Sequence, residues 1–370
     1  MDFMILSYLL VMRDARPPLI GAADNMNNIA ILSTLFKMSG AFYIKRTGQR
    51  FPKVYRAVLN EFMKSVLENE MNMEFFMEAT RSRTGQVLFP KFGMLKYVVE
   101  AFLEKRIPDV YMIPLNVTYE NLIEADSYIG EHRGGQRVGE STMRTIKSIS
   151  LINRNYGRII INSAKPISLR NYVDWYAKGK PDRDVAIHVH EDQFVQELGL
   201  YLTNVLQEKS VFMHTHLVCA ILLMRHHYQL VKDVESSVRM LSAQIKARNG
   251  TIFEIEENEF NFETAVKCFK NRLSIRGDTF NEKRVCVDRT NYLENCLSLK
   301  YYANSMNYLF FIEAVIYFSA SNQYALEKTV ELDKLWNKVS LLLSVFKKEI
   351  FLMEIPRSKE EMISFIKQKE

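Results

Sequence analysis

The chain has 370 residues, of which 48% are hydrophobic and 25% are charged, so it can bury a large core and is excluded from the intrinsically disordered class. Its formal net charge of +6 is mildly basic and suits an anionic small molecule or a phospholipid surface as well as nucleic acid. The four cysteines follow no zinc-ligand spacing, which favours reduced thiols in an intracellular protein: Cys219, Cys268, Cys286 and Cys296.

The chain begins inside an apolar run, residues 3–12. No basic segment precedes this run and no small-residue cleavage site follows it, so it is not a signal peptide. Domains seldom start directly within a hydrophobic segment, and we expect that a front end is missing. Further on, the apolar stretch at residues 308–318 is interrupted by Glu313 and is shorter than the roughly 18–20 residues that span a bilayer. We predict a buried helix there.

Residues 1–175 alternate between strand-like and helical patterns. Helical spacing of apolar residues follows Pro52 and runs to Leu67; it recurs from Met94 to Leu103, before Pro108, and more weakly at residues 141–153. Between these patterns lie β-rich runs at residues 18–22, 41–45, 73–77, 110–119 and 157–162. This alternation predicts an α/β fold with a mostly parallel sheet flanked by helices.

The second half of the chain is predicted to be mainly helical. Residues 178–184 are polar and contain a proline, so we interpret them as a linker between a domain at residues 1–177 and a region at residues 185–370. A clear apolar stripe at helical spacing runs from Leu332 to Phe346. Nothing in this region indicates chemistry, which is typical of a helical cap or accessory domain.

Polar residues follow two of the predicted strands. Lys45 ends the run at 41–45 and Arg46 follows it, at the edge where open α/β sheets bind ligands. After the run at 73–77 come a carboxylate, a hydroxyl and two guanidiniums within one turn, namely Glu78, Arg81, Ser82 and Arg83. Guanidiniums suit phosphate oxygens, and we expect the carboxylate to stay ionised beside them. A solvated strand end is the alternative interpretation of the first segment.

A proline within an apolar strand is a third unusual feature. Pro114 stands inside the run at 110–119, which indicates a strand edge, a bulge or an altered strand end. Taken alone, this feature is structural.

In their order and spacing, these segments resemble blocks of the glycerolipid acyltransferases. They are most similar to the branch that acylates glycerol 3-phosphate or dihydroxyacetone phosphate. The second family block is similar to residues 40–46, the third, F-x-E-G-x-R-S-R, to residues 76–83, and the fourth, an apolar strand with a proline, to residues 113–115. The resemblance covers residues 1–175 well and continues weakly beyond them.

The first family block, H-x-x-x-x-D, is matched only in its aspartate. Asp2 occupies that place and is followed by Leu6 to Leu9, which resemble the family's L-S-x-L. The resemblance implies that the block's histidine is the general base and lies upstream of Met1. None of the seven histidines in the chain has an aspartate five residues later, and we interpret the pairs His188/His190 and His214/His216 as surface or packing residues rather than metal ligands. No metal site is predicted.

The resemblance also implies roles for the other residues. Asp2 is the partner of the missing histidine, and Pro114 shapes the acyl-donor side. The residues that contact the phosphate and orient the acceptor are Lys45, Arg46, Glu78, Arg81, Ser82 and Arg83. The sequence departs from the family at Ala79, where the family usually has a glycine that permits positive φ, so Thr80 and Arg81 are expected to shift slightly.

The implied activity is transfer of a fatty acyl group from acyl-CoA, as co-substrate and without a cofactor, to the sn-1 hydroxyl of dihydroxyacetone phosphate or glycerol 3-phosphate. Residues 90–95 and 38–42 favour the dihydroxyacetone-phosphate branch of ether phospholipid synthesis, which is peroxisomal. The chain ends without an S-K-L-type signal, so the endoplasmic reticulum and the mitochondrial outer membrane stay open. Contact with the membrane is predicted to be peripheral.

Two alternatives belong to other classes. A catalytically dead relative would bind the phosphorylated acceptor or acyl-CoA, or scaffold an active partner, without turnover. The absent histidine favours this alternative, whereas the hydrophobic start favours an incomplete copy of an enzyme. Nucleic-acid binding is disfavoured because the basic residues cluster at strand ends and form no known binding motif.

Overall fold

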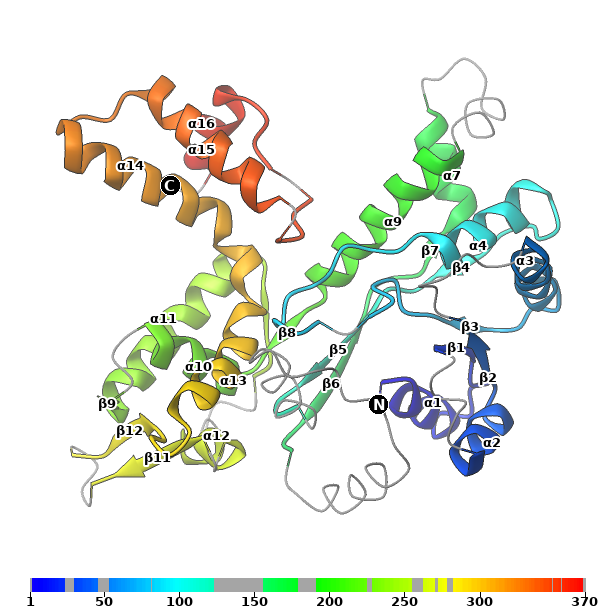
Figure 1. The fold of residues 1–370 in the computed structure, drawn as a ribbon, viewed down its shortest axis with the longest axis horizontal. Helices are drawn as coiled ribbons and strands as arrows, with labels where there is room; N and C mark the ends of the chain where they lie inside the picture. The colour runs from blue at the N-terminus through cyan, green and yellow to red at the C-terminus, as the bar shows by residue number, and fades with distance from the viewer. Residues whose placement is uncertain are drawn as a thin grey trace.

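The computed structural model of the chain describes residues 2–23, 30–45, 53–80, 82–122, 156–178, 191–224, 228–254, 262–269, 272–277, 282–347, 349–353 and 355–368. Figure 1 shows the first half of the chain, in blue and cyan, on one side of the molecule and the helices of the second half on the other. The long helix α9, Glu191–Glu208, runs between these two sides.

A three-stranded parallel sheet forms the beginning of the fold. Strand β1, Leu19–Ala23, lies between β2, Ala41–Ile44, and β3, Met73–Glu74, in the order β2-β1-β3. The connections contain α2, Ala30–Met38, and α3, Lys53–Glu68, and the chain enters through α1, Asp2–Val11. Parallel neighbours joined through helices confirm the predicted α/β class.

The predicted helices at Pro52–Leu67 and Met94–Leu103 are both present and pack together. Helix α4, Gly93–Leu103, lies against α3. Between them Lys64 is buried, with its ammonium 2.6 Å from a carboxylate oxygen of Glu104 and 3.7 Å from one of Glu100. Two carboxylates compensate the charge of a lysine that would otherwise be costly to bury.

The predicted strand at residues 110–119 is divided at its proline. Strand β4, Tyr111–Met112, pairs antiparallel with β7, Ile167–Ser168, and β5, Leu115–Tyr119, pairs antiparallel with β6, Ile159–Ser163. Pro114 is buried at the junction, and its carbonyl accepts a hydrogen bond of 2.9 Å from the N–H of Ala164. The altered strand end that the proline indicated is therefore present.

One hydrophobic core joins residues from both sides of the predicted linker. It contains two residues of α4, three of α7, Leu169–Ala177, and four of α9. These residues are Leu95, Val99, Leu169, Tyr172, Val173, Phe194, Val195, Leu198 and Leu202. A Cβ added at Gly199 of α9 would lie 2.6 Å from the ring of Phe92, so the helix needs a glycine to approach this closely. Most of the linker, residues 179–184, lies outside the described residues.

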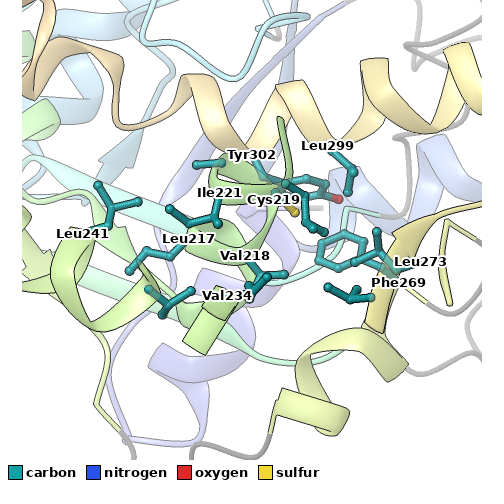
Figure 2. Close-up of a cluster of buried hydrophobic side chains, with 14 of the residues drawn as sticks. Leu217, Val218, Cys219, Ile221, Val234, Leu241, Phe269, Leu273, Leu299 and Tyr302 are labelled. Atoms are coloured by element: carbon teal, nitrogen blue, oxygen red, sulfur yellow. The ribbon is translucent and has the colours of Figure 1, made fainter. Parts of the chain in front are cut away.

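The second half contains a larger core and a helical tip. Figure 2 shows the larger core, formed by α10, His214–Met224, α11, Val231–Ala247, α12, Phe262–Cys268, and α13, Tyr292–Asn304. The tip contains α14, Phe311–Glu327, α15, Leu332–Phe346, and α16, Lys359–Lys367. Helix α15 matches the predicted apolar stripe. No helix in the described part of the chain is long and apolar enough to cross a membrane.

Two small sheets interrupt this mainly helical region. Strand β8, Val211–Phe212, pairs parallel with β10, Thr251–Ile252. Strand β12, Arg284–Val287, lies antiparallel between β11, Leu273–Arg276, and β9, Tyr228–Leu230. The apolar stretch at residues 308–318 forms a short 3-10 helix, Asn307–Leu309, and the start of α14, where Ile312, Val315 and Ile316 are buried but Tyr317 is 76% exposed.

Candidate functional site

Asp2 and the last residue of β5 meet, although they are 117 positions apart in the chain. Asp2 is the first residue of α1 and is half-buried. The hydroxyl of Tyr119 donates a hydrogen bond to its Oδ1 atom. A carboxylate at the N-terminus of a helix also faces the partial positive charge of the helix dipole, which stabilises it.

Two glutamates join Asp2 at the end of the third strand. Glu74 is the last residue of β3, and Glu78 lies in the turn that follows. The pKa of both carboxyl groups is raised to about 7, chiefly by burial and in part by the negative charge of Asp2. Glu74 and Glu78 therefore each lie close enough to Asp2 for its charge to act on them, and these three residues form the carboxyl cluster.

Burial opposes the expectation that Glu78 stays ionised. Desolvation is the largest influence on its pKa, and it outweighs the hydrogen bond of 3.1 Å that Glu78 Oε2 accepts from the N–H of Leu88. With a pKa of about 7, the carboxyl group is protonated in a large fraction of molecules at neutral pH. It can then donate as well as accept a hydrogen bond.

The turn after β3 adopts the conformation for which the family's glycine is suited. Ala79 has a φ of 53°, in the left-handed region that glycine occupies without steric strain. The hydroxyl of Ser82 is buried and has no hydrogen-bond partner among the described residues. Arg83 is exposed. A buried hydroxyl without a partner among the described residues, four positions after Glu78, is available to a ligand.

The other predicted phosphate-binding residues are only partly described. Lys45 directly follows β2 and is exposed, with its ammonium 5.8 Å from the centre of the Tyr55 ring. Its N–H donates a hydrogen bond of 3.2 Å to the hydroxyl of Tyr55. Arg46 and Arg81 lie outside the described residues, so their convergence on the carboxyl cluster stays a prediction.

The loop after the turn, residues 82–92, is held by the second half of the chain. Gly85 has a φ of 82°, and a Cβ there would lie only 1.9 Å from the carbonyl oxygen of Tyr301 in α13. Asn304, in the same helix, donates a hydrogen bond of 3.0 Å to the carbonyl of Thr84. The ring of Phe89 packs edge-on against that of Phe351, 5.5 Å away. The second half therefore fixes the loop that carries Ser82 and Arg83.

Sequence reasoning missed Glu74 and Tyr119. A charged residue inside an apolar strand is a signal that could have found Glu74, since charge is uncommon at a buried strand position. Tyr119 gives no local signal, because its partner Asp2 is distant in the sequence.

The two histidines that the structure describes, His214 and His216, both belong to α10. His216 is buried in α10, and burial lowers its pKa to about 4. His214 is half-buried, and burial lowers its pKa as well. His188 and His190 lie outside the described residues. In the described part of the chain, no three side chains of His, Cys, Asp or Glu are grouped so that they could hold a metal ion.

Two family models match the chain in succession. The first, described as acyltransferase, covers residues 1–118, and the second, described as glycerol-3-phosphate acyltransferase C-terminal region, covers residues 128–369. The chain belongs to the glycerol-3-phosphate acyltransferase family. This confirms the family that the blocks around Glu78 and Pro114 indicated.

Similar curated proteins carry two names. The glycerol-3-phosphate acyltransferase of Pseudomonas entomophila (strain L48) is 26% identical over 373 residues, which cover 98% of this chain and 43% of that protein. The dihydroxyacetone phosphate acyltransferase of Oryctolagus cuniculus is 33% identical over 60% of this chain and 34% of its own length. That of Homo sapiens is 34% identical over 53% and 31%. The chain thus spans less than half the length of these relatives.

Proposed function

We propose that this chain carries the acceptor side of an O-acyltransferase, which moves a fatty acyl group from acyl-CoA to the sn-1 hydroxyl of dihydroxyacetone phosphate or glycerol 3-phosphate. The observation that supports the proposal best is that Glu74 and Glu78, at and after the end of β3 in a parallel sheet, both lie close enough to Asp2 to interact with its charge. Open α/β sheets bind ligands at the carboxyl ends of their strands.

The proposed reaction needs a general base beside Asp2. In the family resemblance this base is the histidine five positions before the aspartate. Its imidazole takes the proton of the acceptor hydroxyl while the oxygen attacks the thioester carbonyl. The thiolate of CoA then leaves with that proton. Asp2 keeps the imidazole in the useful tautomer and stabilises it when it is protonated.

The remaining residues are proposed to bind the substrates. Lys45, Arg46, Arg81 and Arg83 contribute positive charge toward the acceptor phosphate, and guanidinium forks match its oxygens. Glu78 and Ser82 orient the acceptor, and Glu78 can donate or accept a hydrogen bond near neutral pH because its pKa is about 7. Pro114 is proposed to shape the acyl-donor side.

The cellular setting is part of the proposal. The lipophilic product and acyl chain favour peripheral attachment to a membrane. The similarity of this chain to dihydroxyacetone phosphate acyltransferases favours ether phospholipid synthesis and a location in the peroxisome. The endoplasmic reticulum and the mitochondrial outer membrane are the alternative locations. Acyl-CoA is proposed as the co-substrate, with no further cofactor.

A relative that binds without turnover is the second candidate. It is favoured by one observation, namely that none of the seven histidines in these 370 residues precedes an aspartate by five positions. Such a protein would keep the acceptor-binding residues and lack the base.

One experiment separates the two candidates. The messenger RNA is sequenced upstream of Met1, the protein that it encodes is expressed, and transfer from radiolabelled palmitoyl-CoA to each acceptor is measured. Turnover that is abolished by Asp2→Ala supports the acyltransferase. Binding of glycerol 3-phosphate by calorimetry without turnover supports the binding relative. If the protein shows neither turnover nor binding, the proposed function is refuted.

A further inference from the structure

The carboxylate of Asp2 lies in surroundings that oppose its negative charge. Glu74 and Glu78 face it, and each interacts unfavourably with it when ionised. The hydroxyl of Tyr119 also faces it and donates a hydrogen bond to Oδ1. A hydrogen bond to an ionised carboxylate is among the stronger ones in proteins, so this donor offsets part of the repulsion.

Tyr119 is itself held in place by the second half of the chain. Its carbonyl oxygen lies 3.0 Å from Nε2 of His216 in α10. The Nδ1 atom of that imidazole is 3.4 Å from the N–H of Met213, so Nδ1 is the acceptor and Nε2 carries the proton that is donated to Tyr119.

His216 makes a rigid support for this contact. Its side chain is buried, and its ring stacks on Tyr302 of α13 with the centroids 5.5 Å apart and the planes 20° from parallel. The hydroxyl of Tyr302 accepts a hydrogen bond of 2.8 Å from the N–H of Leu122, three residues after Tyr119. The end of β5 is therefore held at two points by the core that Figure 2 shows.

We propose that Tyr119 is a positioning residue for the acid–base pair of the reaction, because its hydroxyl fixes Oδ1 of Asp2 and leaves Oδ2 to receive the imidazole of the general base. This inference rests on the proposed function. It assigns to the end of β5, and through His216 to α10, a part in catalysis that the family blocks do not include.

The test uses the full-length protein with a general base and the variant Tyr119→Phe. We expect kcat to fall about 10-fold and the KM for the acceptor to change less than about 2-fold, because the hydroxyl contacts Asp2 and not the substrate. The acid limb of the pH profile should move upward by roughly half a pH unit, because an aspartate that has lost a donor stabilises the imidazolium more strongly. The control is Tyr111→Phe, on β4 with an exposed side chain, which should change neither quantity.

A second measurement tests the contact without turnover. Urea unfolding of the 370-residue chain is compared for Asp2→Ala, Tyr119→Phe and the double variant. If the two groups are in contact, the second substitution has little effect after the first, with a coupling of about 5-fold or more in the unfolding equilibrium constant. Additive effects would overturn the contact.

The outcomes separate this inference from the proposed function. If the unsubstituted full-length protein transfers no acyl group, both are overturned. If it is active and Tyr119→Phe matches Tyr111→Phe in kcat and pH profile, only the positioning role is overturned. A loss of activity that follows a loss of stability, with no movement of the acid limb, would assign Tyr119 a purely structural role and overturn the proposal as well.

Discussion

Replacing Gly85 with alanine tests whether the second half of the chain fixes the loop at residues 82–92. The new Cβ would lie 1.9 Å from the carbonyl oxygen of Tyr301, and the φ of 82° is unfavourable for alanine. The left-handed conformation costs about 1–2 kcal/mol, and overpacking against an atom that can move only with its backbone costs about 1–3 kcal/mol. Removing glycine from the unfolded state offsets about 0.4–1 kcal/mol. We therefore expect a net loss of about 3 kcal/mol in the free energy of unfolding.

The assay is urea unfolding of the intact chain followed by far-UV circular dichroism, together with limited trypsin digestion. Arg83 is exposed in the same loop, so trypsin should cut after it faster when the loop is displaced. Gly93→Ala is the matched control, because a Cβ at that residue meets no atom within 4 Å and alanine favours the helix that begins there. Equal stability of the two variants within about 0.5 kcal/mol, with unchanged cleavage, would refute the reasoning.

Three further substitutions test other features of the structure. Ala79→Gly should stabilise the chain by about 0.5–1 kcal/mol in urea unfolding, because the φ of 53° suits glycine; a loss of stability would show that the turn is not left-handed. For Glu78, the folded pKa of about 7 exceeds the unfolded value, so ionisation of its carboxyl group destabilises the folded state. The contribution of the protonated group to the free energy of unfolding is fully present below about pH 4.5 and is lost as pH rises through 7. Glu78→Gln stays neutral and should therefore gain about 3 kcal/mol over the parent between pH 4.5 and 8, whereas parallel pH curves would contradict the buried carboxyl. Lys64→Ala should destabilise by about 1–3 kcal/mol because it leaves Glu100 and Glu104 without their partner, a smaller loss than for a fully buried pair since the side chain of Glu104 is 50% exposed; a loss under about 0.5 kcal/mol in thermal unfolding would show that the pair is solvated.

Local periodicity was sufficient to predict the elements that bury one face. The apolar stripes of α3, α4 and α15 and the β-rich runs of β1 and β2 were predicted within a few residues. The short strands β9, β11 and β12 were not, because three or four residues give too little pattern to distinguish them from loops.

The site was predicted where its residues follow one another and missed where they come from distant parts of the chain. Glu78 and Ser82 belong to one local block, whereas Tyr119 reaches Asp2 only through the folding of β5. For Glu78 the sequence shows its charged neighbours but not its burial, which raises the pKa of its carboxyl group to about 7. Burial depends on the loop at residues 82–92, which the second half of the chain holds.

The position of α9 limits how this protein could exchange parts with its relatives. Phe194 and Leu198 belong to one core with residues of α4 and α7, and Gly199 admits the ring of Phe92. A recombination junction within residues 179–190 would place an α9 from one parent against an α4 and α7 from another, and two surfaces selected for each other would be separated. A junction after Glu208 would carry the three helices together. Hybrid chains joined after α9 should therefore fold more often than hybrids joined before it, and viable natural exchanges between relatives should favour the same place.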